Sequence, residues 1–263
     1  MNLLIITMLC VFSSAEMRLT PKQQATVLHE AQTSYDSGVS LQSADPVAAK
    51  ESFRRSANRF QVLVNDGVLN GRLWFNLGNA NVQAGEIGKA IAAYRSAQHY
   101  IPSDGRLQAN LMHARTLVDN PIIGTAKRTF LDRLTFWHNT LPTSIRLGLG
   151  MMCWFAFWGL VGIRIFKGIP GFKSALCFLG FFSIALSVSV GLDIATQHLQ
   201  HGVIVNDEVI VRKGNGVNYA PLFKEPIHEG VEFEIIEQRP EWLHILLPNG
   251  SKGWVEESSA LLV

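Results

Sequence analysis

The side chains that most often carry catalysis are isolated from one another along this sequence. Cys10, Cys153 and Cys177 each lie in an apolar run, with no histidine or second cysteine at metal-ligand spacing, so we expect neither a zinc site nor a disulfide framework. His244 alternates with apolar residues and is expected on the surface of a strand. The patterns G-x-S-x-G, G-x-x-x-x-G-K-[ST] and H-E-x-x-H are missing from the sequence. We therefore predict no catalytic residues, no metal site, no cofactor and no enzymatic activity.

Charge is unevenly distributed along the chain, which carries a formal net charge of +2. Residues 126–173 hold seven lysines or arginines against one aspartate, whereas residues 201–263 hold five against ten acidic residues. A basic segment beside apolar runs is typical of a membrane surface rather than of a nucleic-acid site. We expect a membrane protein that does not bind nucleic acid.

The elements that would position any binding residues are clearest in residues 71–104. Trp74, Leu77 and Asn81 recur at helical spacing and share one face of a first helix, and Gly85 suits the left-handed turn after it. A second helix ends before Pro102, which cannot continue it. The pattern predicts a close helix pair, with Trp74 buried between its two helices. The inner face of the second helix is marked by Ala90, Tyr94 and Ala97.

The spacing of these residues resembles the tetratricopeptide repeat, a unit of ~34 residues. Two ordinary amphipathic helices are the alternative, and Asn81 stands where an aromatic residue is usual. The resemblance implies an all-α tetratricopeptide-repeat domain over residues 21–120, with its clearest repeat at 71–104. The matching residues are Trp74, Leu77, Gly78, Ala90, Tyr94 and Pro102; a degenerate preceding repeat is marked by Ala49, Phe53 and Ser56, and a capping third helix by Leu107, Leu111, Ala114 and Val118.

In such arrays the first helix of each unit lines a concave groove. The resemblance therefore implies that Asn76, Asn79 and Gln83 point into a peptide groove, with Asn110 and His113 in matching places on the next helix. Asparagine both donates and accepts hydrogen bonds, so it can hold a peptide backbone or a carboxylate. These side chains are expected to lie off the packed core. Surface amides without a ligand are the alternative.

Two segments outside the repeats relate to the membrane. Residues 1–15 are predicted to be a signal peptide, because a short apolar core is followed by small residues. An uncleaved anchor is the alternative. Residues 125–141 mix Lys127, Arg128 and Arg133 with Phe130 and Trp137 and predict an amphipathic linker helix. It would lie at the membrane interface or pack on the repeats.

Two long apolar runs predict transmembrane helices at 144–165 and 174–193. A pair of buried core helices is the alternative. The short connection carries Arg164, Lys167 and Lys173 and no acid, which places it in the cytoplasm and both flanking regions outside. We expect a transmembrane hairpin in a bacterial inner membrane, with the other domains on the periplasmic side.

Residues 201–263 alternate apolar and polar residues, and Asn249-Gly250 is a typical hairpin turn. A small all-β barrel is predicted, with strands that include 203–205 and 209–211. The segment resembles a bacterial SH3-like domain. Candidate surface residues are Tyr219, Trp242 and Trp254, with core packing as the alternative for both tryptophans. The resemblance is carried by Val211-Arg212, Gly214, Gly216, Gly230, Trp242 and Gly253-Trp254-Val255.

The order of signal, repeats, membrane hairpin and SH3-like tail resembles the BatE-type family of the Bacteroides aerotolerance operon. The resemblance is carried by the stretches 74–80, 85–91 and 109–111. It implies membrane-anchored von Willebrand factor A domain proteins of the same operon as partners, together with a MoxR-type ATPase system. The expected function is a non-enzymatic scaffold for protein–protein interactions, linked to envelope or oxidative stress tolerance. The alternatives are a cell-wall-binding protein whose SH3-like tail recognises peptidoglycan peptides, and an enzyme of unknown type.

Overall fold

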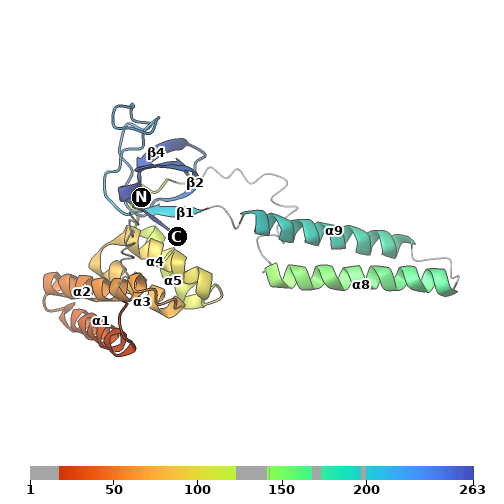
Figure 1. Cartoon of the computed structure of the whole chain (residues 1–263), viewed down its shortest axis with the longest axis horizontal. Coiled ribbons are helices and arrows are strands. Elements are labelled where there is room, and N and C mark those ends of the chain that lie inside the picture. Colours follow the sequence, from red (N-terminus) through yellow and green to blue (C-terminus); the bar gives the residue numbers. More distant parts are fainter. Residues whose placement is uncertain (1–17, 123–140, 142, 168–172, 197–199) are drawn as a thin grey trace, which may run out of the picture. The chain divides into compact units, whose positions relative to one another are not determined.

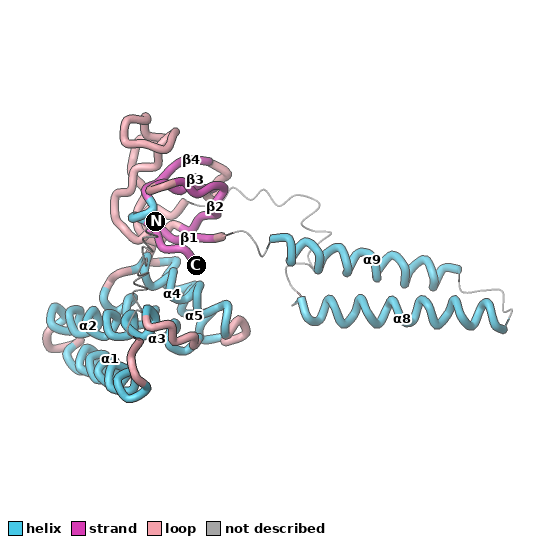
Figure 2. The backbone as a smooth tube through the Cα atoms, in the orientation of Figure 1, coloured by secondary structure: helices cyan, strands magenta, loops and turns pink. Residues whose placement is uncertain are grey.

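The computed structural model describes residues 18–122, 141, 143–167, 173–196 and 200–263. Within these ranges the chain forms a helical unit, a pair of long apolar helices and a small antiparallel sheet (Figure 1; Figure 2). This agrees with the predicted multi-domain class. The predicted signal peptide and residues 125–140 of the predicted linker helix lie outside the described residues.

The helical unit begins and ends its helices where local sequence signals predict. Asp45 accepts a hydrogen bond from the backbone N–H of Ala48, and Pro46 occupies the first turn of the following helix. Gly85 ends another helix in the left-handed region, at φ 76°. The helices are α1 (Pro21–Leu41), α2 (Pro46–Asn65), α3 (Gly71–Ala84), α4 (Ile87–Tyr100) and α5 (Gly105–Thr116).

Two glycines let neighbouring helices approach closely. A Cβ atom added to Gly78 on α3 would lie 2.4 Å from Cε1 of Tyr94 on α4, and one added to Gly38 on α1 would lie 2.7 Å from Cε1 of Phe53 on α2. Tyr94 and Phe53 are both almost completely buried. The pairs α1–α2 and α3–α4 therefore pack through the same kind of contact, a glycine against an aromatic ring.

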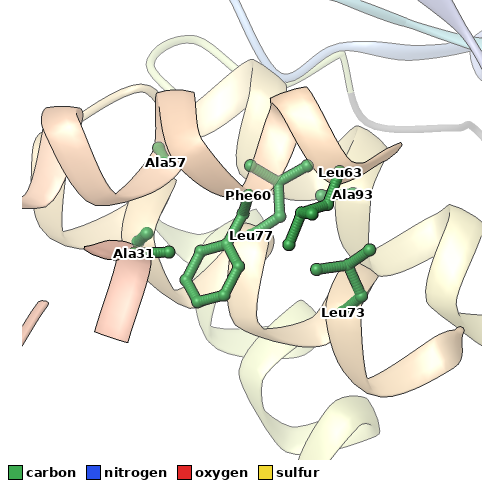
Figure 3. Packing of buried hydrophobic residues seen from close by; sticks show 8 residues of the cluster. Ala31, Ala57, Phe60, Leu63, Leu73, Leu77 and Ala93 are labelled. Carbon is green, nitrogen blue, oxygen red and sulfur yellow. The ribbon is translucent and has the colours of Figure 1, made fainter. Parts of the chain in front are cut away.

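One cluster of buried apolar residues in the helical unit draws on α1 to α4 (Figure 3). Trp74 packs against this core but is only partly buried, so the expectation of a buried Trp74 is wrong. The prediction that this face of α3 packs inward is confirmed by Leu77, which is 2 % exposed. The buried residues of this cluster are Ala31, Ala57, Phe60, Leu63, Leu73, Leu77, Ala80 and Ala93.

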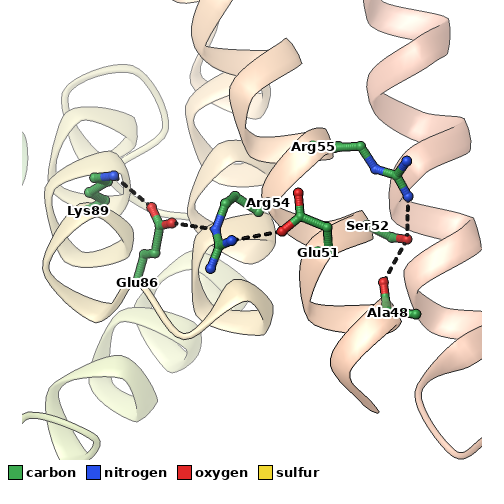
Figure 4. A network of polar contacts seen from close by, with 7 residues as sticks. All are labelled: Ala48, Glu51, Ser52, Arg54, Arg55, Glu86 and Lys89. Atoms are coloured by element: carbon green, nitrogen blue, oxygen red, sulfur yellow. Dashed lines mark hydrogen bonds and ion pairs between the residues drawn. The ribbon is translucent and has the colours of Figure 1, made fainter. Parts of the chain in front are cut away.

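A polar network joins α2 to the start of α4 (Figure 4). The Glu86 carboxylate forms ion pairs with Lys89 Nζ at 2.8 Å and with Arg54 Nε at 3.2 Å. Arg54 also forms an ion pair with Glu51 at 2.7 Å. Burial opposes ionisation of Glu86, but the hydrogen bonds and charges of Lys89 and Arg54 outweigh it and hold its pKa below the usual value. The network therefore links the α1–α2 pair to the α3–α4 pair at their surface.

The long apolar helices α8 (Thr143–Lys167) and α9 (Lys173–Thr196) pack against each other. Both are long and apolar enough to cross a membrane. Large side chains such as Phe155, Phe166 and Phe181 are exposed, which is unlike the core helices of a water-soluble protein. The guanidinium of Arg146, near the start of α8, is buried and donates to the hydroxyls of Ser189 on α9 and Thr143. Residues 168–172 of the predicted cytoplasmic connection lie outside the described part.

The C-terminal sheet has the strand order β4-β3-β2-β1-β5, and all its neighbours pair antiparallel. The predicted hairpin turn is present, because Gly250 has φ 84° and joins β3 to β4. The predicted strand at 209–211 is not formed, because Val209 makes only an isolated bridge to Ile227 and the next two residues make none. The strands are β1 (His201–Ile204), β2 (Glu232–Arg239), β3 (Trp242–Leu246), β4 (Lys252–Glu256) and β5 (Ala260–Leu262).

Candidate functional site

Two adjoining hollows of about 340 Å³ each run between α1 and α3. They share Gln32 and Asn76, so they form one continuous depression, here named the α1–α3 groove. The first hollow is lined by Gln32, Tyr35, Asp36, Phe60, Asn76 and Asn79. The second is lined by Pro21, Gln24, Ala25, Leu28, Gln32, Leu63, Val68, Asn70, Arg72, Leu73 and Asn76.

The groove has an apolar floor and a polar rim. Phe60, Leu63 and Leu73 are buried core residues that contribute to its lining. Gln32 on α1 and Asn76 on α3 line both hollows, and their side-chain amides make no hydrogen bond within the described part of the chain. Their amides are therefore available to a ligand, as expected for Asn76. An apolar floor with convergent amides suits an extended polypeptide.

Asn79 has a structural role as well as a place in the groove. Its Oδ1 accepts hydrogen bonds from Tyr94 Oη and from Asn110 Nδ2, each at 2.8 Å. The expectation that the groove asparagines lie off the packed core is therefore wrong for Asn79, because Tyr94 is a central core residue. The second of these bonds brings Asn110 of α5 next to Asn79 of α3, but Asn110 lines neither hollow.

The other two predicted groove residues are at the margins. Gln83 is exposed, and its Oε1 accepts a hydrogen bond from Gln42 Nε2 at 3.2 Å, which links the C-terminal ends of α1 and α3. His113 is exposed on α5 and does not line either hollow.

Gln32, Tyr35 and Asp36 of α1 form one wall of the first hollow, and sequence reasoning did not identify them. The resemblance of the preceding repeat rests on its second helix alone, at Ala49, Phe53 and Ser56. The signal in the sequence is the spacing of Gln32, Tyr35 and Asp36 at i, i+3 and i+4, which places them on one face of a helix.

Tyr35 and Asp36 differ in their electrostatic setting. Tyr35 is partly buried, and this burial, with the neighbouring Asp36 charge, raises the pKa of its hydroxyl above 10.0. The hydroxyl therefore stays protonated at neutral pH and can donate a hydrogen bond. Asp36 is exposed at the rim, where it adds a negative charge to the first hollow.

The candidate residues of the C-terminal sheet fall into two kinds. Trp242 and Trp254 are 9 % and 8 % exposed, so packing accounts for both. The ring of Trp254 stacks on His244, with centroids 4.6 Å apart, and lies 5.0 Å from the guanidinium of Arg239. Tyr219 is 53 % exposed and remains available as a surface residue.

Within the described residues, no group of three His, Cys, Asp or Glu side chains is placed to hold a metal ion. A scan against models of known protein families found no match to this chain, and a search of curated proteins also found none. The site is therefore interpreted from its own geometry.

Proposed function

We propose that this protein is a non-enzymatic, membrane-anchored scaffold whose α1–α3 groove binds an extended segment of another protein. The observation that carries the proposal is the groove itself, with its buried apolar floor and the two amides of Gln32 and Asn76, which are available for hydrogen bonding. A polypeptide backbone offers both donors and acceptors to such amides. The two apolar helices α8 and α9 support attachment of this groove to a membrane.

The finer assignments belong to the same proposal. The glycine–aromatic contacts of α1–α2 and α3–α4 support a tetratricopeptide-repeat type of helical unit. The five-stranded antiparallel sheet supports an SH3-like tail. On the residue matches given above, we assign the protein to a BatE-type complex with membrane-anchored von Willebrand factor A domain proteins. Its two binding modules would face the periplasm, because positive charge between the spans favours a cytoplasmic connection.

The test uses the full chain in its native membrane. A photo-crosslinking residue at Leu28, in the second hollow, should capture a membrane partner, which is then identified by mass spectrometry. The double variant Gln32→Ala/Asn76→Ala should reduce this capture. Each net hydrogen bond contributes about 0.5–1.5 kcal/mol, so affinity should fall about fivefold or more.

Asn58→Ala is the matched control. Asn58 is exposed on α2 and lines a different hollow, on the opposite side of α1. Capture by this variant should equal that of the unaltered protein. Equal capture by the double variant and the control would exclude the groove as the binding surface. Retention of the protein on purified cell walls, unaffected by the double variant, would instead favour peptidoglycan binding through the tail.

A further inference from the structure

The first hollow of the α1–α3 groove has a chemical character of its own. Its lining combines the carboxylate of Asp36, the rings of Tyr35 and Phe60, and the side-chain amides of Gln32, Asn76 and Asn79. No lysine, arginine or histidine lines this hollow among the described residues. Arg72 lines the second hollow instead, so the two hollows differ in charge.

The carboxylate at the rim has no ion-pair partner in the part of the chain that the structure describes. The Asp36 carboxylate is exposed and makes no hydrogen bond there, whereas Glu30 on the other side of α1 pairs with Arg59 at 3.1 Å. A ligand carboxylate in the first hollow would meet like charge, which lowers affinity. Binding of a carboxylate ligand by the groove amides is therefore disfavoured in the first hollow.

The remaining groups favour a cation. A lysine or arginine side chain can bring its charge to Asp36 while its methylene stem lies along the rings of Tyr35 and Phe60. The amide oxygens of Gln32 and Asn76 can accept the remaining N–H donors of the cation.

We infer that the first hollow is a specificity pocket for a lysine or arginine side chain of the bound segment, with Asp36 as its counter-charge. This rests on the proposed function, because it names the residue type that the groove selects in an extended partner. The partner's flanking residues lie over the apolar floor of the second hollow, where Leu28 and Leu73 favour aliphatic side chains.

The experiment is a selection of random nonapeptides, displayed on phage, against the full chain in nanodiscs. Nine extended residues span about 30 Å, which is about the length of the 21-residue helix α1. We expect selected peptides to carry lysine or arginine at one fixed position. Replacing that residue by glutamine in a synthetic peptide should weaken binding about three- to fivefold, the size of one exposed ion pair.

Asp36→Asn should abolish the preference for a basic residue without affecting folding. Glu30→Gln removes the same charge from the other side of α1 and should leave the preference intact. Selected peptides without a basic position, or an unchanged preference in Asp36→Asn, would overturn the pocket assignment while leaving the groove as a binding surface. No selection above empty nanodiscs would overturn the groove and the pocket together.

Discussion

Gly78 of α3 lies directly against the ring of Tyr94 of α4, and Gly78→Ala tests the packing of this pair. The added methyl would lie 2.4 Å from Cε1 and 2.5 Å from Cδ1 of Tyr94. The ring cannot move aside easily, because Tyr94 is 1 % exposed and its hydroxyl donates to Asn79. The helices must therefore separate, or the ring must leave its preferred rotamer.

The expected cost follows from two opposing effects. Overpacking a dense core destabilises by about 1–3 kcal/mol. Alanine also favours the helix over glycine by about 0.8–1.0 kcal/mol. The net loss in the free energy of unfolding should be about 0–2 kcal/mol, with a central value of about 1 kcal/mol. Gly105→Ala in the first turn of α5 is the control, because its added methyl meets no atom within 4 Å, and it should be neutral or stabilising.

The measurement is hydrogen–deuterium exchange of α3 and α4 in the full chain, held in nanodiscs. Gly78→Ala should speed exchange in these helices, and Gly105→Ala should not. The cost of Gly78→Ala should shrink when Tyr94 is also replaced by leucine, which makes room for the methyl. A Gly78→Ala protein as protected as the control would refute the close packing inferred for this pair.

Three further predictions concern the core, acid stability and topology. Tyr94→Phe should lower the free energy of unfolding by about 1 kcal/mol, since Asn79 loses one of its two donors; denaturant titration measures this. The hydrogen bond from the Leu19 N–H holds the pKa of Asp66 below its ordinary value of 3.8. The ionised Asp66 carboxylate therefore stabilises the fold above pH 3.8, and this contribution is lost as the pH falls through the lower pKa of the folded state. Asp66→Asn should remove this part of the acid dependence of Leu19 amide exchange. A cysteine at Gly168, with the native cysteines replaced, should resist an impermeant thiol reagent applied from outside, whereas one in the β3–β4 turn should react; the reverse pattern would place the groove in the cytoplasm.

Local patterns were sufficient to predict the boundaries and faces of most elements. Asp45-Pro46 and Gly85 start and stop helices because caps depend on the side chain and backbone of one or two residues. Ala90, Tyr94 and Ala97 identify a buried face because helical periodicity is a property of a single segment. The apolar runs of α8 and α9 are likewise evident from composition.

Contacts between elements were decided only by the tertiary structure. Helical periodicity predicts which face of α3 carries Asn79. It does not predict that Tyr94 of α4 and Asn110 of α5 donate hydrogen bonds to Asn79. The charge of the first hollow depends on Asp36, which lies 40 residues before Asn76 in the chain. The sequence by itself therefore determined the helices, the two long apolar segments and the face of α3 that carries the amides. The pairing of this face with α1, which forms the groove and brings Asp36 to it, arises from long-range packing.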